Sequence, residues 1–305
     1  MALSPARKRE LARLCGDRIS FEVNMARHCT LRAGGMAAAL AEPENIQQAA
    51  RLVRYCAEQA MPWRGIGRGS NLLVRDAGYP GVLIRFAGRK CVFDTKNSSG
   101  LEAESGCLLA ELLGFCHKHS LAGLEFLRSI PGTVGGAVRM NAGAFGREIS
   151  QFLTSFRVLA GRGEMYDIGS DQWRAGYRTM TIEGVELSEV LLLSARFSLS
   201  SGRKEEIAAT MAAYRGKRRG KQQPCLPSAG SFFKNPQGGY AGRLIEEAGL
   251  KGLRVGGAMV AEEHANFIVN TGGATAADII ALMELVQEKV MVRTGIFLEP
   301  EVHIL

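Results

Sequence analysis

The sequence predicts a mixed α+β protein with two domains. The chain has 305 residues, a length that favours about two domains. Short apolar runs typical of strands alternate with amphipathic helical stretches up to residue 200. A basic helix and a Pro/Gly-rich loop then follow. We therefore expect one domain over residues 1–200, itself split near 85–90, and a second over 201–305.

In the first domain, apolar periodicity predicts helices over 5–15, 44–60 and 107–119. The second of these helices has a small and apolar face formed by Ile46, Ala49, Ala50, Val53, Ala57 and Ala60. Strands are expected over 63–66, 82–86, 101–104 and 189–199. The runs SFRVLA and EMYDI, joined by Gly161–Gly163, predict a β-hairpin.

The second domain begins with a basic helix over 203–219, and a loop follows it. Further elements are expected as a helix over 240–248, strands near 257–260 and 266–270, and a closing strand in IFLEPEVHIL. Thr275 and Asp278 resemble a capping box, which predicts a helix start. The apolar stripe of that helix contains Ile279, Met283, Val286 and Val290.

Composition and charge exclude several classes of protein. Hydrophobic residues make up 46% of the chain and charged residues 22%, as in soluble globular proteins. No apolar run reaches the roughly 18 residues of a membrane span, and the N-terminus lacks the apolar core of a secretory signal. We expect a cytoplasmic protein. The net charge of +8 fits either nucleic acid or an anionic small substrate.

Cysteine and histidine spacing gives no support for a metal site or a disulfide framework. The seven cysteines contain no CxxC pair, and an odd number without a signal peptide argues against a disulfide scaffold. His117 and His119 are two residues apart on an expected helix, so they do not share a face. We expect no metal, and we interpret most cysteines as small buried side chains.

Two glycine-rich segments are the most informative feature of the chain. GIGRGSNLLV runs from Gly65 to Val74, and GLEFLRSIPGTVGGAVRMNAGAFG from Gly123 to Gly146. Glycine lets main-chain N–H groups approach phosphate oxygens closely. Together the segments suggest one extended cofactor that carries phosphate, although each alone also fits an ordinary turn. The first segment matches neither the Rossmann nor the Walker A spacing.

Three short segments combine reactive side chains with turn-forming neighbours: AGYRTM, PSAGSFFKNP and LEPEVH. Each has an ordinary structural alternative. Arg178 also fits a surface cation, Ser231 a turn hydroxyl and Glu301 an outward side chain on a strand. Ser231 lacks the G-x-S-x-G context of a hydrolase nucleophile, so a hydrolase triad is poorly supported.

Taken in order, GRGSNLLV, SIPGTVGGAVRMNAGAFG, GYR, PSAGSFFKNP, HANFIVN and EPEV resemble the UDP-N-acetylenolpyruvoylglucosamine reductase family, in its shorter type. The resemblance runs from about residue 20 to the C-terminus. It implies a non-covalent FAD in a two-part α+β module of the vanillyl-alcohol-oxidase type, followed by an α+β substrate domain. It also implies NADPH as electron donor and reduction of UDP-N-acetylglucosamine enolpyruvate to UDP-N-acetylmuramate for peptidoglycan synthesis.

The resemblance also implies roles for individual residues. Arg178, Ser231 and Glu301 match the catalytic positions, and Tyr177, Lys234 and Asn235 the substrate-binding ones. The cofactor-binding positions are Gly67, Arg68, Gly69, Ser70, Asn71, Pro131, Gly132, Thr133, Gly135, Gly136, Ala137, Asn141 and Gly143. Met180 stands where the family usually has Ser, which leaves the geometry of the Tyr177–Arg178 loop open.

The implied chemistry suits these residue types. Hydride reaches the terminal methylene of the enolpyruvyl ether, and charge builds on its carboxylate, where Arg178 stabilises it. Ser231 then donates a proton to the neighbouring carbon. A protonated Glu301 would donate a hydrogen bond to the enol.

The basic stretch Lys217–Lys221 fits either a solvated helix end or a contact with the UDP diphosphate. We expect a monomer that binds a UDP-sugar and NADPH, without nucleic acid or membrane partners. Two alternatives remain open: an FAD oxidase of the same superfamily acting on an alcohol or sugar lactone, and a basic nucleic-acid-binding protein without catalysis.

Overall fold

The computed structural model describes residues 3–93, 100–219 and 225–305. The chain forms two compact units, and neither is one continuous stretch. Unit 1 contains residues 1–21, 38–68 and 80–217, and unit 2 contains 22–37, 69–79 and 218–305. The units therefore differ from the predicted division at residue 200, because helix α5 (Lys204–Arg219) falls almost entirely in unit 1 and two early segments fall in unit 2.

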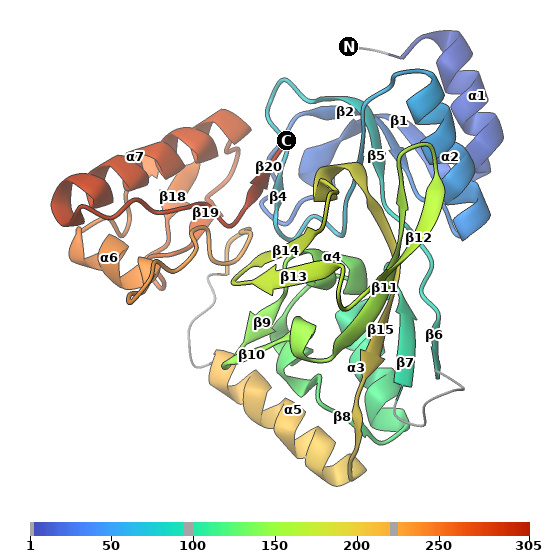
Figure 1. Ribbon diagram of the computed structural model, residues 1–305. Coiled ribbons are helices and arrows are strands. Elements are labelled where there is room, and N and C mark those ends of the chain that lie inside the picture. Colours follow the sequence, from blue (N-terminus) through green and yellow to red (C-terminus); the bar gives the residue numbers. More distant parts are fainter. Residues whose placement is uncertain (1–2, 94–99, 220–224) are drawn as a thin grey trace. The chain divides into compact units, whose positions relative to one another are not determined.

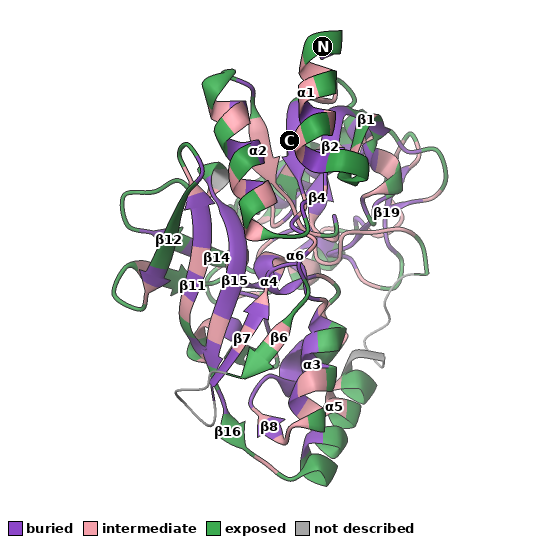
Figure 2. Ribbon diagram, turned by 90° about the vertical axis from the view of Figure 1, so that its right-hand side faces the viewer, coloured by how far each residue is buried: buried purple, intermediate pink, exposed green. Residues whose placement is uncertain are grey.

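A five-stranded antiparallel sheet forms the centre of unit 1 (Figure 1). Its strands, in spatial order, are β12 (Glu164–Gly169), β11 (Leu153–Ala160), β15 (Leu191–Ser198), β7 (Gly100–Glu104) and β6 (Cys91–Phe93). Strand β15 is buried along most of its length (Figure 2), since it lies between β11 and β7.

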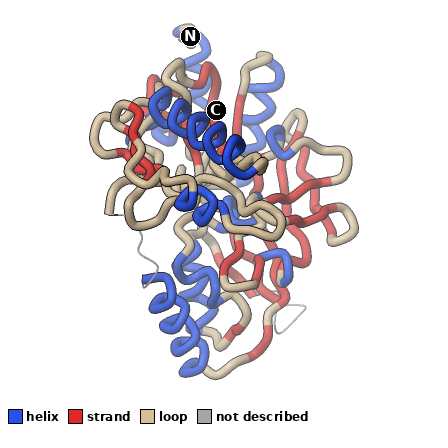
Figure 3. The backbone as a smooth tube through the Cα atoms, turned by 90° about the vertical axis from the view of Figure 1, so that its left-hand side faces the viewer, coloured by secondary structure: helices blue, strands red, loops and turns tan. Residues whose placement is uncertain are grey.

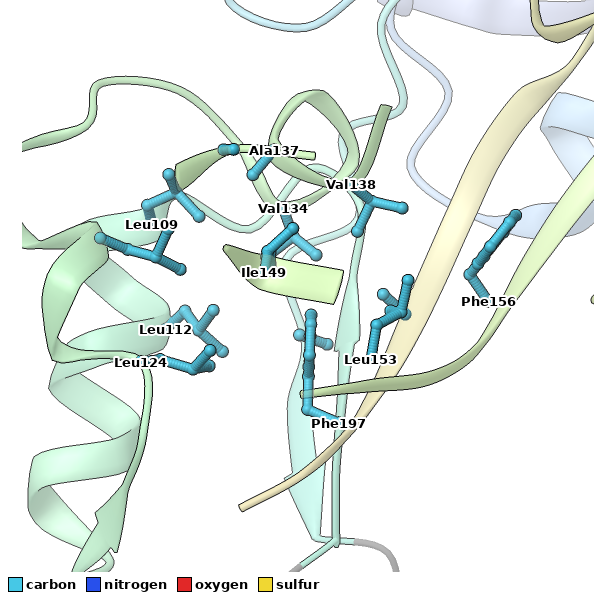
Figure 4. Packing of buried hydrophobic residues seen from close by; sticks show 14 of the residues in the cluster. Leu109, Leu112, Leu124, Val134, Ala137, Val138, Ile149, Leu153, Phe156 and Phe197 are labelled. Carbon is cyan, nitrogen blue, oxygen red and sulfur yellow. The ribbon is translucent and has the colours of Figure 1, made fainter. Parts of the chain in front are cut away.

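Helices α3 (Leu109–Lys118) and α4 (Val134–Arg139) pack with this sheet around one hydrophobic core. Figure 4 shows side chains from the helices, such as Leu112 and Val138, gathered with Phe156 and Phe197 of the strands. Helix α4 contacts β15 and β7 directly. The core therefore fixes the position of the glycine-rich segment that contains α4.

A second sheet has the order β1 (Ile19–Asn24), β2 (Met36–Ala41), β5 (Tyr79–Ile84) and β3 (Trp63–Gly65). Helices α1 (Pro5–Cys15) and α2 (Ile46–Glu58) pack against it around a separate core. Strand β3 pairs in parallel with β5 and leads straight into the first glycine-rich segment. In α2 the buried side chains are Ala49, Leu52, Val53 and Cys56.

Short paired strands complete unit 1. A hairpin is formed by β13 (Trp173–Gly176) and β14 (Thr179–Ile182), and β9 (Gly143–Ala144) pairs with β10 (Arg147–Glu148). Strands β8 (Leu121–Ala122) and β16 (Ser200–Ser201) form a further pair. The ring of Tyr214 on α5 stacks on Phe145, which connects α5 to the β9–β10 turn.

Unit 2 contains more loop than regular structure (Figure 3). Its helices are α6 (Ala241–Glu247) and α7 (Ala276–Thr294). A small antiparallel sheet has the order β17 (Arg254–Val255), β18 (Ala258–Val260), β19 (Ile268–Asn270). Strand β20 (His303–Ile304) pairs in parallel with β4 (Leu72–Leu73).

Segments far apart in the sequence hold unit 2 together. The carboxylate of Asp76 accepts hydrogen bonds from the main-chain N–H groups of Ala276 and Ala277, at 2.9 and 2.8 Å, and so caps the start of α7. The side-chain amide of Asn270 donates to the carbonyl oxygen of Leu31 at 3.0 Å. The early segments are therefore an integral part of this unit.

Most of the predicted elements are confirmed, including the hairpin of β11 and β12 and the capping box of α7. The closing strand is wrong over most of its length, because only His303 and Ile304 are strand. Strands β1 and β2, helix α4 and the β13–β14 hairpin were not predicted. Among the described residues, no helix is long and apolar enough to cross a membrane.

Candidate active site

Unit 1 contains a cleft at the place where the two glycine-rich segments meet. Its space is about 420 Å³, part of it open to solvent. One wall is the main chain of Gly65–Gly67 at the end of β3, and another is the N-terminal turn of α4 with Thr133, Gly135 and Gly136. The two segments predicted to share one cofactor therefore line the same cleft.

The glycine positions of the cleft differ in what a Cβ placed there would meet. A Cβ at Gly67 would have Thr133 Oγ1 as its nearest neighbour at 3.5 Å, and one at Gly136 would lie 3.6 Å from the same atom. Both positions therefore have space that a ligand can use. A Cβ at Gly135 would lie only 2.7 Å from Cβ of Ser105. Gly135 therefore lets α4 pack against Ser105, and because it also lines the cleft, its contact with a cofactor stays a prediction.

Positive charge collects beside this cleft. Arg85 donates to the carbonyl oxygen of Gly67 at 3.1 Å and pairs with Glu42. Arg139 at the end of α4 donates to the carbonyl oxygen of Leu187 at 2.7 Å. Burial, and then the nearby positive charge of Arg64, lowers the pKa of Arg139. Buried Nε of Arg64 has no hydrogen-bond partner among the described residues.

This electrostatic arrangement suits an anion. Two neighbouring guanidinium groups oppose each other in the protein alone, and a bound phosphate would relieve that repulsion. Arg64, Arg85 and Arg139 were not singled out from the sequence. The signal for two of them was present, since Arg64 is a single cation within β3 and Arg85 directly follows β5.

Arg178 occupies the turn between β13 and β14. Gly176 pairs with Thr179, so Tyr177 and Arg178 form the tip of the hairpin. Arg178 has a φ of +56°, in the left-handed region that few side chains adopt. Its guanidinium lies 5.0 Å from the centre of the Tyr177 ring. Met180 is 2% exposed and packs in the core, so its presence here is compatible with a regular hairpin.

The hairpin tip lies over the second glycine-rich segment. Nη1 of Arg178 would be 3.4 Å from a Cβ at Gly143. The side-chain amide of Asn141 donates to the carbonyl oxygen of Gly176 at 2.9 Å and to Glu148 at 2.8 Å, and its oxygen accepts from the N–H of Ser150. Asn141 is fully buried and its polar groups are used within the protein. It holds the hairpin in place, and its predicted contact with a cofactor stays a prediction.

In unit 2, Ser231 and Glu301 lie on two paired segments. Phe233 pairs with Pro300 in an antiparallel bridge, and the N–H of Glu301 donates to the carbonyl oxygen of Phe232 at 2.8 Å. The structure therefore brings Ser231 and Glu301 close together along this short ladder. The Ser231 hydroxyl has no hydrogen bond to any of the described residues, so it is available to a ligand.

A buried amide supports the Ser231 segment. Asn266 accepts from the N–H of Phe233 at 2.9 Å and donates to the carbonyl oxygen of the same residue at 2.8 Å. Its own carbonyl oxygen accepts from the N–H of Phe232. The sequence analysis noted HANFIVN as a whole and missed this residue, because a hydrogen bond between segments so far apart leaves no local pattern.

Several residues of unit 2 that were predicted to contact a ligand also take part in interactions within the protein. Asn71 donates to the carbonyl oxygen of Glu301 at 2.9 Å. Asn235 accepts from the N–H of Ala241 at 3.0 Å and so caps α6. Lys234 forms an ion pair with Glu299. Gly69 has a φ of +71°, and a Cβ there would collide with the carbonyl oxygen of His28.

The predicted cofactor positions are divided between the two units. Gly67 and Arg68 belong to unit 1, whereas Gly69, Ser70 and Asn71 belong to unit 2. Pro131, Gly132 and Ala137 stay in unit 1 beside the cleft residues Thr133 and Gly136. The described residues contain no group of three or more side chains able to hold a metal ion.

Comparisons with known proteins match two parts of the chain. Residues 37–169 match an FAD binding domain, and residues 222–305 match the C-terminal domain of UDP-N-acetylenolpyruvoylglucosamine reductase. A UDP-N-acetylenolpyruvoylglucosamine reductase of Geotalea uraniireducens is 42% identical over 298 residues, which cover 98% of this chain and 97% of the relative. The chain belongs to this reductase family. A relative of the same description from Syntrophus aciditrophicus is 39% identical over 300 residues.

Solved structures support the same fold. The crystal structure of the family member from Thermus caldophilus has a TM-score of 0.77 and 39% identity, and it covers 92% of this chain and 97% of its own. Alkyldihydroxyacetonephosphate synthase has a TM-score of 0.50 at 18% identity over 65% of this chain and 44% of its own. The latter likeness shows the fold alone. The α+β class with an FAD-binding module is therefore confirmed.

The cleft in unit 1 fits the diphosphate of FAD. Glycine main chain, the side chain of Thr133 and the guanidinium groups of Arg85 and Arg139 line the cleft together, and a Cβ at Gly67 or Gly136 would clash with no protein atom. Residues that would hold the cofactor are Gly67, Thr133, Gly136 and Arg139.

Proposed function

We propose that this protein reduces UDP-N-acetylglucosamine enolpyruvate to UDP-N-acetylmuramate, with FAD as a non-covalent cofactor and NADPH as electron donor. The observation that supports this most strongly is the likeness to family members over nearly the whole chain, at 42% identity over 298 residues in one case. The matched regions include an FAD binding domain and the C-terminal domain of the family.

We assign charge stabilisation to Arg178. A bound FAD would supply the hydride chemistry that links NADPH to the double bond of the substrate. The carboxylate of the enolpyruvyl group then gains negative charge, and a fixed guanidinium nearby stabilises that charge. The position of Arg178 above Gly143 supports the assignment, because Gly143 follows the segment that lines the cofactor cleft.

Ser231 is our candidate for the proton donor. Its hydroxyl is free of hydrogen bonds to the described residues, and Asn266 holds the main chain on which it sits. Glu301 lies on the paired segment, and we assign to it a hydrogen bond to the developing enol. Tyr177, Lys234 and Asn235 are proposed to contact the substrate.

The partners follow from this chemistry. A UDP-sugar and NADPH are both anionic, which fits the net charge of +8 without any nucleic acid or membrane partner. We propose that the enzyme works as a monomer in the cytoplasm, where these nucleotides are made. Of the basic stretch proposed to meet the UDP diphosphate, Lys217 is exposed on α5, whereas Gly220 and Lys221 lie outside the described residues.

The absorption spectrum of the purified protein tests this function. A flavin spectrum that NADPH bleaches, and that UDP-N-acetylglucosamine enolpyruvate restores without oxygen, is the expected result. Reoxidation only by oxygen, with turnover of an alcohol or sugar lactone, would identify an FAD oxidase instead. Absence of flavin together with salt-dependent binding of nucleic acid would contradict both enzyme functions.

A further inference from the structure

Two cysteines of unit 1 lie in contact. Sγ of Cys91 on β6 is 3.3 Å from Sγ of Cys107, which follows β7 by three residues. Cys91 pairs with Ala103 across the sheet, and the chain then turns back through Gly106. A Cβ at Gly106 would lie 2.3 Å from the carbonyl oxygen of Phe86, so this turn is tight. A disulfide of about 2.05 Å would require the two sulfurs to approach by about 1.2 Å.

The two thiols differ in their chemistry. Cys91 is half-buried and Cys107 is fully buried. The hydrogen bond from the Cys107 thiol lowers the pKa of Cys91, and the same bond raises the pKa of Cys107. Because thiolates are the reactive form, Cys91 is the group that attacks first. Once Cys91 has reacted, the hydrogen bond that retains the proton on Cys107 is lost, and Cys107 becomes able to react in turn.

Cys107 is joined to the cofactor cleft by main-chain hydrogen bonds. Its carbonyl oxygen accepts from the N–H of Val134 at 2.9 Å, at the start of α4. Two further bonds flank this one. The N–H of Gly135 donates to the carbonyl oxygen of Ser105, and the N–H of Leu109 donates to the carbonyl oxygen of Gly132. Ser105 and Gly135 both line the cleft. The main chain at Cys107 is therefore joined directly to the segment that forms one wall of the site.

We propose that Cys91 and Cys107 are a modification site for small-molecule disulfides, and that the intrachain disulfide formed there weakens the binding of FAD. The second part rests on the proposed function. Cys91 thiolate attacks one sulfur of the small disulfide, and a mixed disulfide forms as one small thiolate leaves. Cys107 then loses its proton to that thiolate and attacks Sγ of Cys91, which releases the second small thiolate. Two protein thiols are oxidised and one small disulfide is reduced to two thiols.

The other cysteines provide a contrast. Burial raises the pKa of Cys15 to about 11, and that of Cys56 and Cys116 to about 12. Cys225 is exposed and its sulfur contacts no other cysteine of the described chain. It would form crosslinks between chains or remain a mixed disulfide. Cys116 is a matched control, because it is a buried cysteine of the same core as Cys107.

The test uses the holoenzyme carrying Cys225→Ser, incubated with oxidised or reduced glutathione. Free thiols are then alkylated and the peptides identified by mass spectrometry, while FAD affinity is measured from flavin fluorescence. We expect a Cys91–Cys107 crosslink and a dissociation constant for FAD raised about tenfold, both reversed by a dithiol reductant. Cys91→Ser and Cys91→Ala should remove both effects, and Cys116→Ser should keep them.

Two results would overturn the proposal. One is the absence of the crosslink when oxidised glutathione is in large excess. The other is a crosslinked protein that binds FAD as tightly as the reduced protein does. The reduced protein provides a separate test of FAD binding. If it binds no FAD, the proposed function fails, while mass spectrometry still detects whether the crosslink forms.

Discussion

The side-chain amide of Asn141 is hydrogen-bonded to the carbonyl oxygen of Gly176, 2.9 Å away. This bond joins the second glycine-rich segment to the hairpin that presents Arg178. Both Asn141 and Arg178 adopt positive φ, at +41° and +56°. The backbone on each side of the bond is therefore held in an unusual conformation, and the bond keeps the two parts in register.

Replacement of Asn141 tests this connection. Asn141→Ala leaves the half-buried carbonyl oxygen of Gly176 and the carboxylate of Glu148 without this donor, so the free energy of unfolding should fall by about 1–3 kcal/mol. Oxidation of the reduced flavin by substrate should slow more than its reduction by NADPH. Stopped-flow absorbance separates these half-reactions. Thr181→Ala, an exposed change on the same hairpin, is the control and should alter neither.

The glycines of α4 should respond in opposite ways. Gly135→Ala forces a Cβ against Ser105 and should destabilise the protein without flavin by about 1–3 kcal/mol. Gly136→Ala meets no atom closer than 3.6 Å, so the protein without flavin should be as stable as the wild type or slightly more so. Its FAD affinity should fall. Thermal unfolding with and without FAD distinguishes the two, and equal behaviour of both variants would be inconsistent with the cleft as the cofactor site.

Replacement of Arg139, which is half-buried, should weaken the binding of FAD. Arg139→Met keeps the apolar volume of the side chain and removes the repulsion with Arg64 that lowers the pKa of Arg139. We expect FAD to bind about tenfold more weakly, a loss typical of one charge-assisted hydrogen bond. Fluorescence titration gives the affinity. Arg157→Met, which removes the exposed pair with Asp167, should bind FAD normally.

Arg178 should matter only after the flavin has been reduced. Arg178→Ala should preserve reduction by NADPH and slow the oxidative half-reaction by about 100- to 1000-fold. Arg178→Lys should restore little, because an ammonium cannot replace the planar guanidinium. Stopped-flow measurement of both half-reactions decides the matter, and equal slowing of the two would argue against charge stabilisation by this residue.

Replacement of Ser231 tests proton transfer separately from hydride transfer. Since its hydroxyl has no hydrogen bond to the described residues, Ser231→Ala should fold and bind FAD normally. Turnover should nevertheless fall at least about 100-fold, and Ser231→Cys should perform better than the alanine variant. In heavy water, the wild type should place deuterium on the carbon next to the carboxylate. Near-normal turnover of Ser231→Ala would leave Glu301 as the candidate donor.

Local patterns allowed the longer elements to be predicted. Helix α7 was found from its capping box and apolar stripe, and Ile279, Met283, Val286 and Val290 are indeed buried. In α2 the predicted apolar face was partly wrong. The helix ends at Glu58, so Ala60 lies beyond it, and burial instead includes Leu52 and Cys56. A count of spacing from Ile46 could not show which face meets the sheet.

Contacts between distant segments account for most of what the sequence did not reveal. Helix α4 was read as loop because glycines dominate it, although the side chain of Thr133 caps its start. Gly135 was assigned to a cofactor, and its close packing against Ser105 was not foreseen. The roles of Asn141 and Asn266 are hydrogen bonds to main-chain atoms 35 and 33 positions away in the sequence. No spacing rule records such bonds.

The interleaving of unit 2 has a consequence for synthesis on the ribosome. Residues 22–37 and 69–79 emerge early, yet the groups that complete their hydrogen bonds, such as Asn270 and the N–H groups of Ala276 and Ala277, are translated near the end. Unit 1 has all its strands once residue 201 has emerged. The early segments of unit 2 therefore stay without these later partners until synthesis is nearly complete, which makes them natural sites for a chaperone to hold.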